Sequence, residues 1–100
     1  MARNSTIPCA AGAWTPVTDG AVSALRLQNI GSYMAMVQAT AAAAPPAEGD
    51  AGVAGAFQLE RWQAIPAGVM LADLFPGVIS GSGYVWVWVD VPGRVSVSHA

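Results

Sequence analysis

Near the C-terminus the chain reads Tyr84-Val85-Trp86-Val87-Trp88-Val89, in which aromatic residues and valines alternate without a break. This period of two predicts a β-strand with the valines on one face and the aromatic residues on the other. Both faces are apolar, so a single sheet with one side in water cannot bury both of them. We therefore expect a second sheet of the same domain, or another protein, to cover the second face.

Alternation of apolar and polar residues recurs at 21–29, 57–60 and 94–98, which predicts further half-buried strands. Residues 33–40 also suit a helix, but the short turn before them favours a strand that returns as a hairpin. A second hairpin is expected around Pro92-Gly93, between the tryptophan strand and the last strand. The expected fold is all-β, a small antiparallel β-sandwich or barrel. The residues expected in its core are Leu25, Leu27, Phe57, Leu59, Val85, Val87, Val89, Val95 and Val97.

The 100 residues suffice for one domain with one core. Residues 1–20 are mostly small or polar and end in an Asp-Gly turn, which predicts an extended N-terminal arm before a single β domain at 21–100. Within that domain, residues 41–56 are rich in Ala, Pro and Gly and predict a long mobile loop. One helical turn is expected at 71–75, with its apolar side chains closing an end of the core.

The composition combines 54% hydrophobic residues with only 10% charged residues, where about 25% charged is typical of soluble domains. No apolar stretch approaches the roughly 20 residues of a membrane helix, so we expect the surplus apolar surface to be buried in protein contacts rather than in a membrane. The net charge is −2, and the four arginines are scattered along a chain without lysine. This distribution argues against a nucleic-acid partner.

Residues suited to catalysis are few in this sequence. The single histidine is His99, and the single cysteine, Cys9, is expected to be a small buried thiol. A pairing of His99 with Ser98 or Cys9 would place the base at a fraying terminus, where it would be poorly held for proton transfer. The carboxylates are spread singly along the chain, apart from one pair in the 41–56 loop. We therefore expect no enzyme activity, no metal site and no cofactor.

The tryptophans carry the remaining functional signal. Trp86 and Trp88 lie opposite the valines of their strand, beside Arg94 of the expected C-terminal hairpin, and this arrangement favours an interaction surface. In the arm, Ile7 and Trp14 are large apolar side chains that a neighbouring subunit would cover. For Trp62 packing in the core is the favoured interpretation, and for Trp14 it is the alternative to a subunit contact. The candidate interface therefore consists of Ile7, Trp14, Trp86, Trp88 and Arg94.

The order of these features along the chain is informative in itself. A polar N-terminal arm and an Asp19-Gly20 turn precede a strand that ends in Leu27-Gln28-Asn29-Ile30-Gly31, and an Ala/Pro/Gly loop separates it from a late Val/Trp hairpin. This layout resembles the small all-β virion proteins of tailed bacteriophages, and most of all their capsid decoration (cement) proteins. The resemblance implies a β-sandwich or barrel, often trimeric, that sits on the outer shell and bridges capsomers without any catalytic residues.

On this resemblance the partners are the chain itself, as a homotrimer, and the major capsid protein. The protein would be made in the host cytoplasm and located on the capsid surface of the virion. A small tail, fibre or baseplate adaptor is an alternative, because it also needs an oligomeric β-unit with apolar interfaces. A third class is a carbohydrate-binding module, in which exposed tryptophans stack on sugar rings and polar neighbours such as Asp90 and Ser96 bind the hydroxyls.

Overall fold

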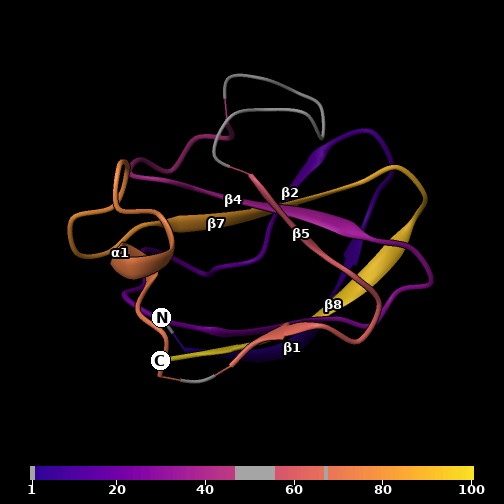
Figure 1. The fold of residues 1–100 in the computed structure, drawn as a ribbon, viewed down its shortest axis with the longest axis horizontal. Helices are drawn as coiled ribbons and strands as arrows, with labels where there is room; N and C mark the ends of the chain where they lie inside the picture. Colours follow the sequence, from indigo (N-terminus) through magenta and orange to yellow (C-terminus); the bar gives the residue numbers. More distant parts are fainter. Residues whose placement is uncertain (1, 47–55, 67) are drawn as a thin grey trace.

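The chain folds as a small β-sandwich of two four-stranded antiparallel sheets in a computed structural model, which describes residues 2–46, 56–66 and 68–100 (Figure 1). The first sheet, called the β8 sheet, has the strand order β1-β8-β3-β6, and the second, called the β7 sheet, has the order β2-β7-β4-β5. The strands are β1 (Arg3–Cys9), β2 (Trp14–Pro16), β3 (Arg26–Asn29), β4 (Ala35–Thr40), β5 (Phe57–Leu59), β6 (Ala64–Ile65), β7 (Tyr84–Val89) and β8 (Gly93–His99), and one helical turn is α1 (Leu71–Leu74).

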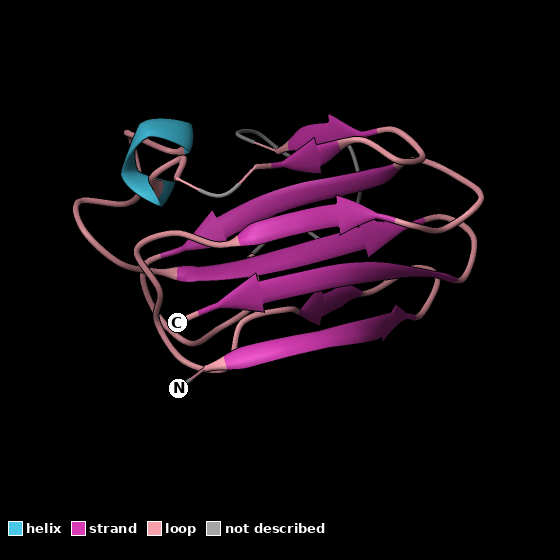
Figure 2. Ribbon diagram, turned by 90° about the horizontal axis from the view of Figure 1, so that it is seen from below, coloured by secondary structure: helices cyan, strands magenta, loops and turns pink. Residues whose placement is uncertain are grey.

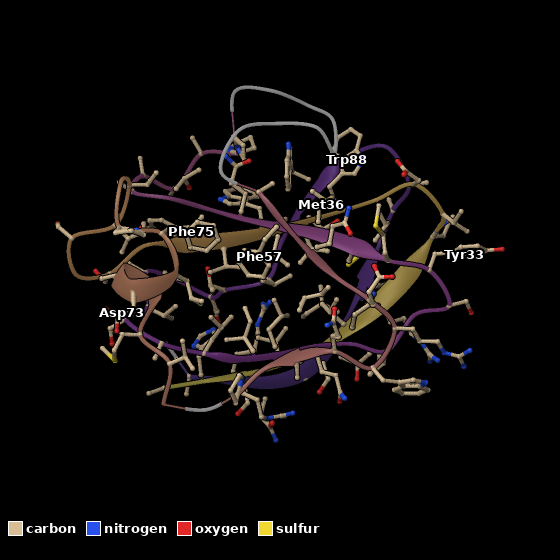
Figure 3. All side chains as sticks on the ribbon, viewed as in Figure 1. Tyr33, Met36, Phe57, Asp73, Phe75 and Trp88 are labelled. Atoms are coloured by element: carbon tan, nitrogen blue, oxygen red, sulfur yellow. The ribbon has the colours of Figure 1, made fainter. Side chains whose placement is uncertain are left out.

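The core lies between the two sheets and is built on the valines of β7 and β8. Val85 and Val87 of β7 and Val97 of β8 have no exposed surface. The expected core is confirmed, except that Phe57 is only partly buried, where its ring stacks on Phe75 at 5.5 Å between centroids (Figure 3). The all-β sandwich predicted from the alternation is therefore the fold of the chain.

Both expected hairpins are wrong. Although β7 and β8 follow each other closely, β7 pairs with β2 and β4, whereas β8 pairs with β1 and β3. In the same way, β3 belongs to the β8 sheet and β4 to the β7 sheet. The short connections carry the chain from one sheet to the other, because strands with one apolar face each bury those faces against each other across a core.

The N-terminal arm expected at residues 1–20 is not confirmed. Residues 3–9 form β1, which pairs with β8 from Arg3 opposite His99 to Cys9 opposite Gly93. Residues 14–16 form β2, which pairs with β7. Each is an edge strand of its sheet, and an edge strand can be more polar than a central one because part of it faces water. The expected loop at 41–56 lies mostly outside the described residues.

The end of the sandwich that carries both chain termini also carries α1 (Figure 1). The expected helical turn is confirmed there: Leu71 is fully buried and Phe75, just after the turn, is 5% exposed. The expected strand at 33–40 is also confirmed as β4, whereas the strand at 57–60 ends at Leu59. The opposite end is formed by four connections, residues 10–13, 30–34, 60–63 and 90–92, and we call it the loop end.

A charge placed in the valine core should unfold the domain. In the variant Val87→Asp, a carboxylate would lie in the central strand at a site with no exposed surface, at a cost of roughly 3 kcal/mol or more. The matched control is Val91→Asp, at a valine that is 40% exposed in the β7–β8 connection. Circular dichroism should show a folded control and an unfolded Val87 variant; equal melting temperatures would contradict the assigned core.

Candidate functional site

The outer face of the β7 sheet gathers three of the four tryptophans. Across β2, β7 and β4, one row consists of Trp14, Trp88 and Met36. The next row on the same face consists of Pro16, Trp86 and Gln38. The indole rings of Trp14 and Trp88 meet edge to face, with centroids 5.6 Å apart and planes at 61°. We call this surface the tryptophan face; it consists of Trp14, Pro16, Met36, Gln38, Trp86 and Trp88.

Only part of the tryptophan face is open to solvent. Trp86 is 8% exposed and its indole N–H donates to Thr40 Oγ1 at 2.8 Å, so this residue packs within its own chain. Trp14 and Trp88 are half-buried, and the indole N–H of Trp88 donates to Asp90 Oδ1 at 3.3 Å. Figure 3 shows Trp88 projecting from the sheet on the side away from Phe57 and Phe75. The expectation that Trp86 is an exposed anchor is therefore corrected.

The other two members of the candidate interface lie on the β8 sheet. Ile7 is on β1, where it is partly buried against the core, and Arg94 is an exposed residue of β8 opposite Pro8. The structure therefore does not bring Ile7 or Arg94 together with the tryptophans. Arg94 was grouped with the tryptophans because β7 and β8 were expected to be neighbours in one sheet, and Ile7 because residues 1–20 were expected to form an arm.

The most exposed aromatic side chains are found at the loop end. Tyr33 is 61% exposed and Trp62 is 58% exposed. Trp62 also has a positive φ of 71°, and the guanidinium of Arg61 lies 5.0 Å from its ring centroid. Val91, from a third connection, is 40% exposed. We call the cluster of Tyr33, Arg61, Trp62 and Val91 the loop-end cluster. Three connections thus present large side chains at one end of the sandwich.

Two of the three loops that carry this cluster are anchored by one buried side chain, Asn29, which is 2% exposed. Its Nδ2 donates to the carbonyl oxygens of Tyr33 and Leu59, both at 2.8 Å, and its Oδ1 accepts from the N–H of Gly31 at 3.0 Å. Both amide hydrogens and the carbonyl oxygen are therefore used. One side chain joins the β3–β4 connection to the end of β5.

Two hydrogen bonds to its backbone, one with a main-chain partner and one with a side chain, hold Trp62 in its uncommon conformation. Its N–H donates to Asn29 O at 2.7 Å, and its carbonyl accepts from Gln28 Nε2 at 2.9 Å. A left-handed backbone costs a non-glycine residue about 1–2 kcal/mol, so the surrounding bonds must stabilise it. Strained backbone of this kind clusters at functional sites, and here it carries an exposed aromatic ring.

Sequence reasoning missed Trp62 because it assigned the residue to the core. The available signal was local: Trp62 is flanked by Arg61 and Gln63 after the alternation of β5 has ended at Leu59. A large aromatic residue among polar neighbours in a turn has no buried face to occupy. Tyr33 gave a weaker signal, since it comes directly before the alternation of β4.

The residues with possible reaction chemistry are far apart or engaged. His99 is 8% exposed, and its Nε2 accepts from the backbone N–H of Asp19 at 3.1 Å. Cys9 lies at the other end of β1, since Arg3 is the residue opposite His99. Cys9 is 3% exposed, as expected of a buried thiol, and burial raises its pKa to about 11 against the opposing effect of a hydrogen bond with Thr15.

Three further properties of the described residues bear on what the chain could bind. No three His, Cys, Asp or Glu side chains among them are grouped to hold a metal ion. The only helix in this part of the chain is a single turn, far too short to cross a membrane. An open hollow of about 290 Å³ lies at the β3 and β8 ends of the β8 sheet, lined by Ala24, Leu25, Arg26, Gly68, Ser98 and Ala100.

Comparison of the chain with protein-family models, with curated proteins and with solved structures finds no match. The loop-end cluster and the open part of the tryptophan face are the two candidate binding surfaces among the described residues.

Fluorescence quenching should separate the exposed tryptophan from the buried one. Because Trp62 is 58% exposed, Trp14 and Trp88 are half-buried and Trp86 is 8% exposed, Trp62→Phe should remove more of the emission that acrylamide quenches than Trp86→Phe does. The measurement is a Stern–Volmer titration of both variants beside the unsubstituted protein. The reverse pattern would show that the loop-end cluster is misassigned.

Removing the Asn29 amide should loosen the loop end. Asn29→Ala deletes three hydrogen bonds and leaves the carbonyls of Tyr33 and Leu59 without this donor, at a cost of roughly 3 kcal/mol. Asn4→Ala, at an exposed asparagine of β1, is the matched control and should change the free energy of unfolding by less than about 0.5 kcal/mol. Denaturant titration measures both values, and equal stability of the two variants would contradict the role given to Asn29.

Proposed function

We propose that this chain is a non-enzymatic virion structural protein that decorates a bacteriophage capsid and stabilises it by bridging capsomers. The observation that carries the proposal is the loop-end cluster, in which Tyr33 and Trp62 are about three-fifths exposed on loops fixed by the buried Asn29. Trp, Tyr and Arg are the residues that most often anchor protein interfaces. Fixed loops favour binding, since little conformational entropy is lost when the partner docks.

The open half of the tryptophan face extends this surface. Trp88 is two residues before the 90–92 connection, and Trp14 directly follows the 10–13 connection, so both lie at the loop end of the β7 sheet. A contact that includes both areas would reach from the tip of the sandwich onto one of its sides. Such a surface suits a small protein that must touch two neighbouring capsomers, and the low charge of the chain, 10% of its residues, suits extensive burial.

The alternatives predict different partners for the same surface. A small tail, fibre or baseplate adaptor would also bind virion proteins, but at few copies per particle. A carbohydrate-binding module would use the tryptophans as a platform for sugar rings. The 61° angle between the Trp14 and Trp88 rings favours a protein partner, because the two rings do not form one flat surface.

The test is binding of the purified chain to phage particles from which it has been removed. Trp62→Ala and Tyr33→Ala should each weaken binding by at least about 30-fold, the equivalent of an interface anchor. The matched control is Val78→Ala, at a valine that is 50% exposed but lies outside the loop end. Circular dichroism should show all three variants folded.

Quantitative mass spectrometry of intact particles distinguishes the alternatives. Many copies, in proportion to the capsomers, support decoration of the shell, whereas a few copies per particle indicate a tail component. Unchanged affinity of the Trp62 and Tyr33 variants, or binding to a glycan array instead of particles, would contradict the proposal.

A further inference from the structure

The strand β1 forms a long free edge of the β8 sheet. In Figure 2 the strand that leaves the N label is the outermost strand of its sheet. Among the four edge strands that the described residues form, β1 has seven residues, whereas β6 has two and β2 and β5 have three each. Short edges offer little to pair with, but a long one presents a row of open N–H and C=O groups. Asn4, Ser5 and Thr6 of β1 are all exposed.

The direction of these backbone groups follows from the neighbouring strands. The carbonyl of Arg94 in β8 accepts from Ile30 N–H, beside β3, while the N–H of Asn29 donates to Gln63, on the other side of β3. Backbone groups alternate in direction along an antiparallel strand. Val95, opposite Asn29, therefore turns its N–H and C=O toward β1, where it faces Ile7.

The same alternation along β1 determines which of its backbone groups are free to bind another strand. Arg3, Ser5, Ile7 and Cys9 direct their backbone groups toward β8, and those of Asn4, Thr6 and Pro8 point away from the sheet. Pro8 has no N–H. Because the backbone of Pro8 points away from β8, this missing donor does not remove any hydrogen bond between β1 and β8. Within β1 the free edge consists of the N–H and C=O groups of Asn4 and Thr6 and the carbonyl of Pro8, and Ala2, just before the strand, has the same phase.

We propose that this edge pairs with the β1 edge of a second copy of the chain, antiparallel and about a two-fold axis at Ser5. In this register Asn4 of each copy lies opposite Thr6 of the other, and each such pair exchanges two backbone hydrogen bonds. The N–H of Ala2 then donates to the carbonyl of Pro8 in the second copy. The two β8 sheets join into one continuous eight-stranded sheet.

The edge is complementary to itself in this register. Moving the axis to Thr6 would place the missing N–H of Pro8 opposite the carbonyl of Asn4, whereas an axis at Ser5 leaves both central pairs complete. Arg3 lies opposite Ile7 of the second copy, so no like charges meet. The Arg3 guanidinium donates to Val17 O at 3.4 Å in its own chain, and a charge held there does not guard the edge against pairing.

A two-fold pair differs from the trimer that the phage resemblance implies. Cyclic pairing of three copies through sheet edges needs two different edges of matching length, and the other described edges have only two or three residues. The pairing stands independently of the proposed capsid role, because it uses β1 and not the loop-end cluster. Loss of self-pairing and loss of particle binding are thus separate results.

Disulfide trapping tests the register. In the proposed pair the two copies of residue 5 face each other at a position without direct backbone bonds, where Cα atoms are about 4.5 Å apart, within disulfide range. Ser5→Cys should therefore form a covalent dimer on mild oxidation. In the matched control Thr6→Cys, the two cysteines are two residues out of register, and their Cα atoms are farther apart than the roughly 7 Å limit for a disulfide. This variant should remain a monomer with a free thiol. The native Cys9 is buried and does not interfere.

A proline substitution tests the backbone pairing itself. Thr6→Pro removes an outward N–H without touching a bond to β8, and should weaken dimerisation by at least about tenfold in sedimentation equilibrium. Thr6→Val keeps the N–H and should dimerise like the unsubstituted chain. Amide exchange at Asn4 and Thr6 should slow as protein concentration rises. The proposal is overturned if Ser5→Cys does not cross-link, if Thr6→Cys cross-links equally fast, or if exchange at these two amides is independent of concentration.

Discussion

The strand β7 needs cover on both of its faces, and the architecture follows from this requirement. Its valines are buried against the β8 sheet, in which Val95 and Val97 fill the opposite side of the core. Its aromatic side chains lie on the outer face, where β2 and β4 flank them and Trp86 is buried within the same chain. A central position gives β7 two neighbouring strands, so neither face relies on a single partner. What remains open is the Trp14–Trp88 half of the tryptophan face.

Much of the fold could be predicted from side-chain periodicity, since alternation determines which residues face the core. It identified β7, β8 and the apolar positions of β3 and β5, and every expected core residue except Phe57 is buried. Periodicity does not determine which sheet a strand joins. A short connection such as residues 90–92 serves a hairpin or a crossing between sheets equally well, and the choice depends on how all eight strands share the core.

The candidate site was harder to predict, because it depends on contacts between distant parts of the chain. In the sequence Asn29 looks like an ordinary turn residue, yet its side-chain amide binds the carbonyl of Leu59, 30 residues further along the chain. The left-handed backbone of Trp62 is held by hydrogen bonds to Gln28 and Asn29 of β3, which is 33 or more residues away in the sequence. Likewise, β1 reads as a polar arm until its register with β8 shows which of its backbone groups remain open. Local patterns carry no information about any of these pairings.

The Asn29 network has a consequence for how the loop end can change over evolution or by design. Asn29 donates to the backbone carbonyls of Tyr33 and Leu59 and accepts from the backbone N–H of Gly31, and Trp62 is likewise held through its own N–H and C=O. The anchoring is therefore largely indifferent to which side chains occupy the loop tips. Residues such as Tyr33 and Arg61 could be randomised while the frame beneath them is retained, as in the libraries built on antibody loops. A 100-residue domain without disulfides would then serve as a scaffold for selecting new binding specificities.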